Sequence, residues 1–435
     1  MKVLISGGGI AGLAAAITLL QGSSNNNNNL EVVILEKDAS SEARIQGFSL
    51  GISPLGATAL QHMNMAHRLV VEKQLVTPLG SNFCLTQHGG NVLLQSSSSS
   101  SASEEEMDLM ELFEKGRTSI NRGVLRQQML QEISRDDRAT ILWSAKVVHL
   151  NYYTTQTQGP PSVQVTLEDG RHITGNVLLG CDGIFSKVRE LLLLPPLPKL
   201  RHLGVAWVRG VCPEQGQLAE WFGDNGHNNN NKKSFTFGMT DPRGAIFLVE
   251  CDKTNLLWYF AFPMKKHDNN TMRIDDREQI LGLLVEQCRH WHPCVLAIIQ
   301  DTLQCQGPML FRHLYDRPPD HLTKYCLPDP SAPITLLGDA LHPVASYALA
   351  GGGSNALSDG VDVAKSLLLV ANSDNHHPAK ALREYERPVL ERSLPQARNS
   401  KWMTTLLHSG WLGGYAARIA FCILRGVLWL LGKSP

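Results

Sequence analysis

The sequence predicts an α/β protein that combines a Rossmann-like domain, an inserted and mostly antiparallel sheet, and C-terminal helices. Three observations support this fold class. The chain opens with a strand, a glycine-rich turn and a helix; short β-like runs follow one another from about residue 200 to residue 327; and a late strand near residue 334 leads into a second glycine run. At 435 residues the chain exceeds the size at which one hydrophobic core stops growing, so we expect more than one structural unit.

The first dozen residues, MKVLISGGGIAG, contain the most informative motif. Lys2–Ser6 is predicted to be a buried parallel strand, and the pattern G-x-G-x-x-G follows at Gly7, Gly9 and Gly12. In this pattern the first glycine permits a tight turn, the second lets a pyrophosphate approach the backbone, and the third lets helix and strand pack closely. A second strand ends at Glu36, whose carboxylate can accept hydrogen bonds from a ribose. The order of elements favours a dinucleotide site over a glycine-rich turn without a ligand.

Composition limits the partners that we expect. Lys+Arg and Asp+Glu are equal at 40 residues each, so a net charge near zero argues against a nucleic-acid partner. Nine scattered cysteines without a secretory segment favour reduced thiols in a cytoplasmic protein. Because the first strand begins at once, we expect no targeting presequence unless one has been trimmed away.

Residues 411–432, near the C-terminus, form a long apolar stretch. Arg418 and Arg425 lie seven residues apart on one helical face, which makes the stretch a poor bilayer span. We favour an amphipathic helix docked on the body of the protein. Peripheral membrane contact through this helix, with the protein membrane-associated, is the alternative, and spanning is the least favoured.

The region between the first motif and residue 200 is predicted to alternate helices and strands. A helix is expected to start near Ser53-Pro54, and stretches 81–94 and 109–120 are expected to be strands on either side of a low-complexity insertion at 96–106. An apolar stripe of period 3.6 predicts a helix over 122–133. Alternating strands follow from 140 to 177.

The second sheet is predicted from runs at 234–239, 245–249 and 256–262, followed by a helix over 277–300. The segment CRHWHPC (288–294) inside this helix invites a metal-site interpretation. However, ligands two positions apart on a helix point in different directions, and a proline disrupts the segment, so no metal site is expected.

Two further strands are predicted to end in polar turns. The strand at 176–179 ends in Gly180-Cys181-Asp182-Gly183, and the strand at 334–337 runs into Gly338-Asp339. A glycine run, Gly351–Gly353, then precedes Asn355 and a helix over about 356–371. Backbone amides at such a turn and at a helix N-terminus can hold an anionic ligand.

Three motifs in this order resemble the class A flavoprotein monooxygenases, the aromatic hydroxylase family built on the p-hydroxybenzoate hydroxylase fold. The motifs are GGGIAGLAAA with Glu36, GCDGIFSKVR at 180–189, and LLGDALHP at 336–343. The resemblance extends from Met1 to about residue 400. It implies a discontinuous FAD-binding domain (1–80, 116–198 and 328–375), a substrate domain (81–115 and 199–327) and a C-terminal helical region (376–435).

The resemblance also implies cofactor-binding residues. They are Gly7, Gly9, Gly12, Glu36, Arg44, Gly47, Arg122, Asp182, Gly183, Asp339, Gly351, Gly352 and Asn355. Arg122 matches the family's arginine on the flavin side of the cofactor, and Asp339 matches the acid that bonds the ribityl chain. Asp182 and Gly183 match a motif linked to both FAD and NAD(P)H. For both aspartates the alternative is ordinary turn chemistry, because Asp beside Gly is common in loops.

The activity implied by the resemblance is that of an FAD-dependent monooxygenase. NAD(P)H and O2 would serve to hydroxylate or epoxidise a small aromatic or hydrophobic substrate through a flavin hydroperoxide. Arg209 matches a substrate-side arginine and is the candidate catalytic residue, against an ordinary strand arginine. Trp258 and Tyr259 either line the substrate cavity or pack within the sheet, and His342 is expected to hold its loop.

The sequence departs from the family pattern after the last strand. Leu341 replaces the second alanine of the usual G-D-A-A-H, and the loop 344–350 lacks a second proline and is about two residues longer than the family pattern has it. The altered loop is the best support for one alternative, a flavin oxidoreductase that does not oxygenate its substrate. A non-catalytic flavoprotein is the second alternative.

Overall fold

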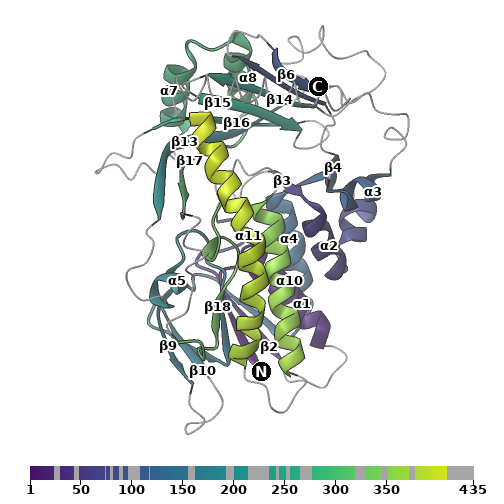
Figure 1. Cartoon of the computed structure of the whole chain (residues 1–435), viewed down its shortest axis with the longest axis vertical. Coiled ribbons are helices and arrows are strands. Elements are labelled where there is room, and N and C mark those ends of the chain that lie inside the picture. The colour runs from purple at the N-terminus through teal and green to yellow at the C-terminus, as the bar shows by residue number, and fades with distance from the viewer. Residues whose placement is uncertain are drawn as a thin grey trace.

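The computed structural model describes residues 1–23, 30–43, 49–73, 75–78, 82–87, 92–96, 108–116, 118–154, 162–192, 200–213, 235–241, 244–250, 255–264, 277–318, 329–344, 351–371 and 378–408. These residues form four sheets, with strand orders β18-β12-β1-β2-β8, β11-β10-β9, β17-β13-β16-β15-β14-β5-β6 and β3-β7-β4. The five-stranded and seven-stranded sheets lie towards opposite ends of the molecule, and the helix α11 runs from one towards the other (Figure 1). The mixed α/β class predicted from the sequence is confirmed.

The five-stranded sheet is parallel throughout. It contains β1 (Lys2–Ser6), β2 (Glu31–Leu35), β8 (Ala139–Leu142), β12 (Val177–Gly180) and β18 (Ile334–Leu336). Its central strands are buried on both faces, which is why their sequences are continuous apolar runs rather than alternating ones. The strand predicted to open the chain has the predicted bounds.

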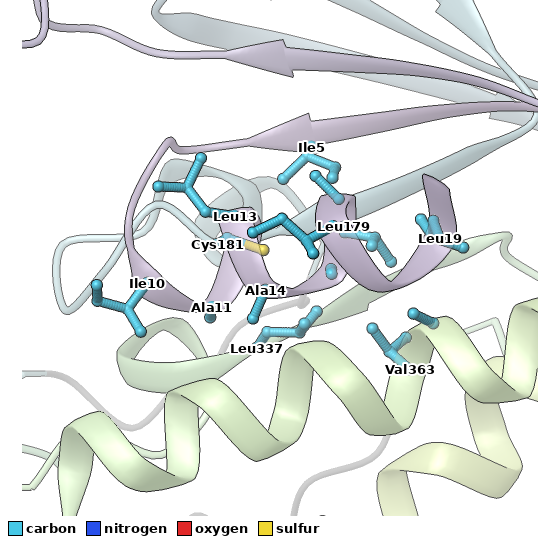
Figure 2. Packing of buried hydrophobic residues seen from close by; sticks show 14 of the residues in the cluster. Ile5, Ile10, Ala11, Leu13, Ala14, Leu19, Leu179, Cys181, Leu337 and Val363 are labelled. Atoms are coloured by element: carbon cyan, nitrogen blue, oxygen red, sulfur yellow. The ribbon is translucent and has the colours of Figure 1, made fainter. Parts of the chain in front are cut away.

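Helix α1 (Ile10–Ser23) packs on this sheet and lies between its strands and α10 (Gly352–Ala371). Every residue of α1 from Ile10 to Leu20 is buried. Figure 2 shows Ile5 and Leu13 on the strand side of this helix, and Ala14 on the side that faces α10 and Val363. α4 (Arg122–Ile133) packs against α1 from another side and has the predicted bounds.

The seven-stranded sheet is antiparallel except for one parallel pair, β14 with β5. Its strands are β5 (Asn82–Gln87), β6 (Val92–Ser96), β13 (Arg201–Pro213), β14 (Phe235–Asp241), β15 (Gly244–Glu250), β16 (Asn255–Pro263) and β17 (Met309–Asp316). Helices α7 (Arg277–Cys288) and α8 (Pro293–Gln304) cover one face and share an apolar core with it.

The remaining elements are the strands of the two three-stranded sheets and the other helices. They are β3 (Ser49–Ile52), α2 (Pro54–His62), η1 (Arg68–Glu72), β4 (Val76–Pro78), α3 (Leu109–Glu114), β7 (Thr118–Asn121), β9 (Val147–Tyr153), β10 (Ser162–Leu167), β11 (His172–Gly175), α5 (Lys187–Leu192), η4 (Gly338–Ala340) and α11 (Pro378–His408). The helix expected near Ser53-Pro54 is α2, capped by the Ser53 side chain.

Three predicted elements differ from the structure. Residues 109–114 form the helix α3 rather than a strand, since the segment LMELFE consists mostly of strong helix formers and buries Phe113. The single helix predicted over 277–300 is divided into α7 and α8, because Pro293 cannot continue a helix and instead starts a new one. α10 begins at Gly352 instead of about residue 356.

Two predicted features fall outside the described residues. They are the low-complexity insertion beyond Ser96 and the apolar stretch 411–432. Among the helices that are described, none has the length and apolar character needed to cross a membrane.

The close approach of α1 and α10 generates a stability prediction. A Cβ added at Gly360 would lie 2.6 Å from the Ala11 carbonyl oxygen and from the Ala15 amide nitrogen, which are rigid backbone atoms. We expect Gly360→Ala to lower the free energy of unfolding by about 1–3 kcal/mol, because the two helices must move apart. Thermal and urea unfolding of the purified protein measure the change.

The matched control is Gly282→Ala in α7, where an added Cβ meets nothing within 4 Å. Alanine favours a helix more than glycine does, so this variant should gain about 0.5–1 kcal/mol. Equal stability of the two variants would contradict the predicted packing of α1 on α10.

Candidate functional site

Four chain segments with polar or glycine-rich turns meet at one edge of the parallel sheet. Gly7–Gly12 follows β1, Glu36 follows β2, Asp182–Gly183 follows β12, and Gly338–Asp339 follows β18. The carboxyl ends of parallel strands share one edge, so segments far apart in sequence are brought together there.

The glycines of the first turn have different environments. Gly7 has φ +108°, and a Cβ there would lie 2.4 Å from the Cys181 carbonyl oxygen. A Cβ on Gly12 would lie 2.3 Å from the Gly7 carbonyl oxygen, so both positions are restricted by the protein itself. A Cβ on Gly9, in contrast, meets nothing within 4 Å. The space beside Gly9 is therefore open, while its neighbours in the motif are packed.

Glu36 is buried at the end of β2 and holds the turn. Its Oε2 accepts a hydrogen bond from the Gly8 amide at 2.9 Å, and its Oε1 accepts one from the Asp38 amide at 3.0 Å. Each carboxylate oxygen can accept two hydrogen bonds, so the side chain keeps acceptor capacity for a further donor.

Arg126 is a site residue that sequence reasoning missed. It is buried on α4, where its Nε donates to the Gly8 carbonyl oxygen at 2.8 Å and its Nη1 donates to the Ser41 carbonyl oxygen at 3.1 Å. Its Nη2 lies 3.7 Å from Glu36 Oε2. The available signal was an arginine one turn after Arg122, within the apolar stripe of a predicted helix.

Asp339 and Arg122 are brought close enough for their charges to interact. Asp339 is exposed, whereas its neighbours Gly338 and Ala340 are buried. Desolvation by the surrounding protein raises the pKa of Asp339, while the charges of His342 and Arg122 oppose this rise. An exposed acid next to a basic side chain at this edge can contact a polar ligand.

Asp182 has a local structural role. Its carboxylate accepts hydrogen bonds from the Ser186 hydroxyl, from the Lys187 amide at 2.7 Å and from the Val188 amide at 3.0 Å, so it caps α5. Burial raises the pKa of Asp182, and these hydrogen bonds lower it. This geometry is the turn chemistry that the sequence left open as an alternative. Beside it, Gly183 has φ +80° and open space around its Cα.

Asn355 directs its side chain into the protein. The amide is buried and exchanges two hydrogen bonds with the Gln396 amide of α11. Its backbone amide donates to the Gly351 carbonyl oxygen at 3.0 Å, which closes the start of α10. Gly352 is the first residue of that helix. A ligand contact at Asn355 would therefore have to use the backbone rather than the side chain.

Arg209 lies on the face of the seven-stranded sheet opposite α7 and α8. Its Cζ is 3.9 Å from the centre of the Trp207 ring and 4.5 Å from that of the Tyr259 ring. Trp258 points to the other face, where its Nε1 donates to Thr302 of α8 at 2.7 Å. Because neighbouring residues of a strand alternate between faces, Tyr259 shares a face with Arg209 and Trp258 belongs to the core.

The described structure gives no role to the remaining residues and sites that the sequence singled out. Arg44 and Gly47 lie outside the described residues, as does the loop 345–350. Within the described part of the chain no three metal-ligating side chains gather. In the segment 288–294, burial raises the pKa of the Cys288 thiol to about 12 and that of Cys294 to about 11.

Known proteins resemble this chain in sequence over long stretches. 6-Hydroxynicotinate 3-monooxygenase from Pseudomonas fluorescens is 28% identical over 259 residues, which cover 57% of this chain and 58% of that protein. Chloroplastic zeaxanthin epoxidase from Nicotiana plumbaginifolia is 25% identical over 394 residues, covering 89% of this chain and 52% of the epoxidase. The matched regions thus span between half and three-fifths of these relatives. No family model matches the sequence.

The fold is shared with solved structures. HpxO from Klebsiella pneumoniae, complexed with FAD and uric acid, has a TM-score of 0.72 at 19% identity and covers 100% of this chain and 97% of that one. The chain thus combines a strand–turn–helix motif and a mostly antiparallel second sheet with these similarities in sequence and fold. In sequence the chain is similar to FAD-dependent monooxygenases, and it shares its fold with the FAD-complexed HpxO structures.

Proposed function

We propose that this chain is an FAD-dependent monooxygenase that uses NAD(P)H and O2 to hydroxylate or epoxidise a small aromatic or hydrophobic substrate. The observation that carries the proposal is the meeting of Gly9, Glu36, Arg122 and Asp339 at one edge of the parallel sheet. The relatives and the fold support the same function.

The residues present fit FAD. The open space beside Gly9 lies at the N-terminus of α1, where backbone N–H groups without helical partners favour a pyrophosphate. Glu36 retains acceptor capacity for the hydroxyl groups of an adenosine ribose. Asp339, exposed beside Arg122, is the acid that would accept hydrogen bonds from the ribityl chain.

FAD, when bound, supplies the redox chemistry by which electrons from NAD(P)H are used with O2. The chain itself binds and orients its ligands. Arg126 holds the Gly8 carbonyl and so fixes the turn that Glu36 braces from the other side. Gly351, Gly352 and the backbone of Asn355 form the start of α10, which we assign to the flavin end of the cofactor.

We also propose Arg44, Gly47, Asp182 and Gly183 as residues of the cofactor site. Because its carboxylate caps α5, Asp182 would act by fixing the loop that contains Gly183 rather than by contacting a ligand itself. We propose that NAD(P)H approaches the cofactor beside this loop. The sequence has a single G-x-G-x-x-G motif after a strand, and that motif is already assigned to FAD.

The substrate is proposed to bind at the face of the seven-stranded sheet that carries Arg209. Its guanidinium, flanked by Trp207 and Tyr259, offers charge beside flat apolar surfaces, a combination suited to an aromatic ring with a polar substituent. The names of the relatives fit small ring compounds, as in 6-hydroxynicotinate and uric acid, and isoprenoids, as in zeaxanthin. Peripheral membrane contact through 411–432 stays a prediction.

The proposed function is tested by spectroscopy and product analysis. The protein should take up FAD, show two visible flavin bands that bleach with NADPH or NADH, and place one atom of labelled O2 in the product. Protein that cannot be reconstituted with FAD would contradict the cofactor assignment. Bleaching with an unlabelled product would favour an oxidoreductase that does not oxygenate.

Gly9→Ala tests the proposed pyrophosphate position. The added methyl group meets no protein atom, so the variant should fold with unchanged stability. It would occupy the space that the pyrophosphate needs, and FAD affinity should fall about tenfold, or ~1.4 kcal/mol. Flavin fluorescence titration measures Kd, with Gly282→Ala as the control that also meets no atom. Equal FAD affinity of both variants would place the cofactor elsewhere.

Arg209→Gln tests the substrate site separately from the cofactor site. Loss of the guanidinium should lower kcat/KM for a turned-over substrate by about tenfold or more, because a charge-assisted contact is worth ~1.5–3 kcal/mol. The Kd for FAD should stay at the wild-type value, since Arg209 lies on the other sheet. Unchanged kcat/KM would show that Arg209 is an ordinary strand arginine without a role in substrate binding.

A further inference from the structure

A fully buried carboxylate lies beneath the turn that contains Asp339. Asp359, on α10, accepts a hydrogen bond at Oδ2 from the Gly338 amide at 2.9 Å, and the same oxygen lies 2.6 Å from Nε2 of the buried His342 imidazole. Its Oδ1 pairs with Nη2 of Arg392, on α11, at 2.6 Å. The Asp359 carboxylate thus links Gly338 and His342, the two ends of the turn, to α10 and α11.

The conformation of the turn depends on Gly338. Its φ is +56°, in the left-handed region, and its carbonyl oxygen accepts hydrogen bonds from the Leu341 amide at 2.9 Å and the His342 amide at 2.8 Å. The backbone therefore closes on itself over residues 338–342. Asp359 binds the first and the last residue of this closed segment, and Asp339 projects from its middle.

Charges around the turn favour an imidazolium paired with a carboxylate. Burial lowers the pKa of His342, but Asp359 and Asp339 raise it, and the net shift is upward. Burial raises the pKa of Asp359, but His342 and Arg392 lower it, and the net shift is downward. Two further cations face the turn. Arg122 on α4 acts on Asp339, and the buried Arg189 on α5 donates from Nη1 to the Ala340 and Leu341 carbonyl oxygens at 3.0 and 3.3 Å.

Two more titratable groups lie near Asp359. They are Cys181, after β12, and Tyr385, on α11, and burial is the main cause of a strongly raised pKa for each. Both therefore stay neutral across the ordinary pH range. A change of charge beneath the turn then comes from titration of the His342–Asp359 pair.

We propose that Asp359 is a positioning residue for the cofactor site: through the Gly338 amide and the His342 side chain, its carboxylate holds the turn that presents Asp339 to the ligand. The proposal rests on the proposed function for the identity of that ligand. It further assigns His342 a role beyond packing, because its contact from Nε2 to Asp359 Oδ2 completes the hold on the turn.

The pH window follows from the directions of the shifts. His342 has a raised pKa in the folded protein, so its contribution is complete below its ordinary pKa and is lost as pH rises through the folded value. Asp359 has a lowered pKa, so its contribution is present above its ordinary value and is lost as pH falls through the folded value. Ligand retention should therefore weaken on the alkaline side through His342.

Asp359→Asn is the test variant and Asp362→Asn is its matched control. Asp362 lies on the same helix and also pairs with Arg392, at 2.8 Å, but its side chain is 37% exposed and bonds neither Gly338 nor His342 in the structure. FAD affinity is measured by fluorescence titration across pH, and hydrogen exchange of the peptide 334–344 is measured in protein without added FAD.

We expect Asp359→Asn to weaken FAD binding about tenfold, to speed exchange of the peptide and to flatten the alkaline fall in affinity. Asp362→Asn should change affinity by about twofold at most, because a partly exposed ion pair contributes little. Identical affinity, exchange and pH profile for the two variants would overturn the proposal.

A second variant keeps the test decisive if Asp359→Asn does not fold. His342→Gln leaves Asp359 with its contacts to Gly338 and Arg392, and it should remove the alkaline fall in affinity; an unchanged pH profile would overturn the role of the pair. If wild-type protein binds no FAD, the proposed function fails. Hydrogen exchange of the turn then still decides whether Asp359 holds it.

Discussion

The close packing of α1 against its neighbours is the constraint on which the rest of the structure depends. Its N-terminal turn passes so near the backbone after β12 that Gly7 and Gly12 leave no room for a Cβ, and Gly360 lets α10 lie against its other side. The helix is thereby enclosed by the sheet and α10, with all of its first eleven residues buried. This burial fixes the direction of the helix N-terminus at the edge where the other turns end.

Acidic residues that follow three parallel strands have three different roles. Glu36 braces the first turn by accepting backbone amides, Asp182 caps α5, and Asp339 is exposed at the edge. Their positions in the sequence are alike, each directly or nearly after a buried strand. They differ in the hydrogen-bond donors that surround each carboxylate. A carboxylate already bound by local amides has less capacity to bind a ligand.

The two faces of the seven-stranded sheet differ in the residues that they carry. One face carries Trp258 and other apolar residues under α7 and α8. The opposite face carries Arg209 with its aromatic neighbours Trp207 and Tyr259. The long helix α11 contacts β15 of this sheet and also bonds α10 through Gln396 and Arg392. The same helix therefore links the sheet of the proposed substrate site to the helix that begins at the proposed flavin end.

The sequence by itself determined the mixed fold class, the bounds of β1 and α4, and the strand–turn–helix motif, because these depend on local patterns: apolar runs, helical periodicity and glycine spacing. The sequence-based prediction was wrong at 109–114, where strong helix formers were assigned to a strand. It was also wrong at 277–300, where a proline that starts a helix was taken only as a disruption. Only the tertiary structure decided that Arg126 belongs to the first turn, that Asn355 pairs with Gln396, and that Asp359 lies beneath Asp339. These contacts join residues from distant parts of the chain, and their partners depend on how the helices pack, which no local pattern of residues records.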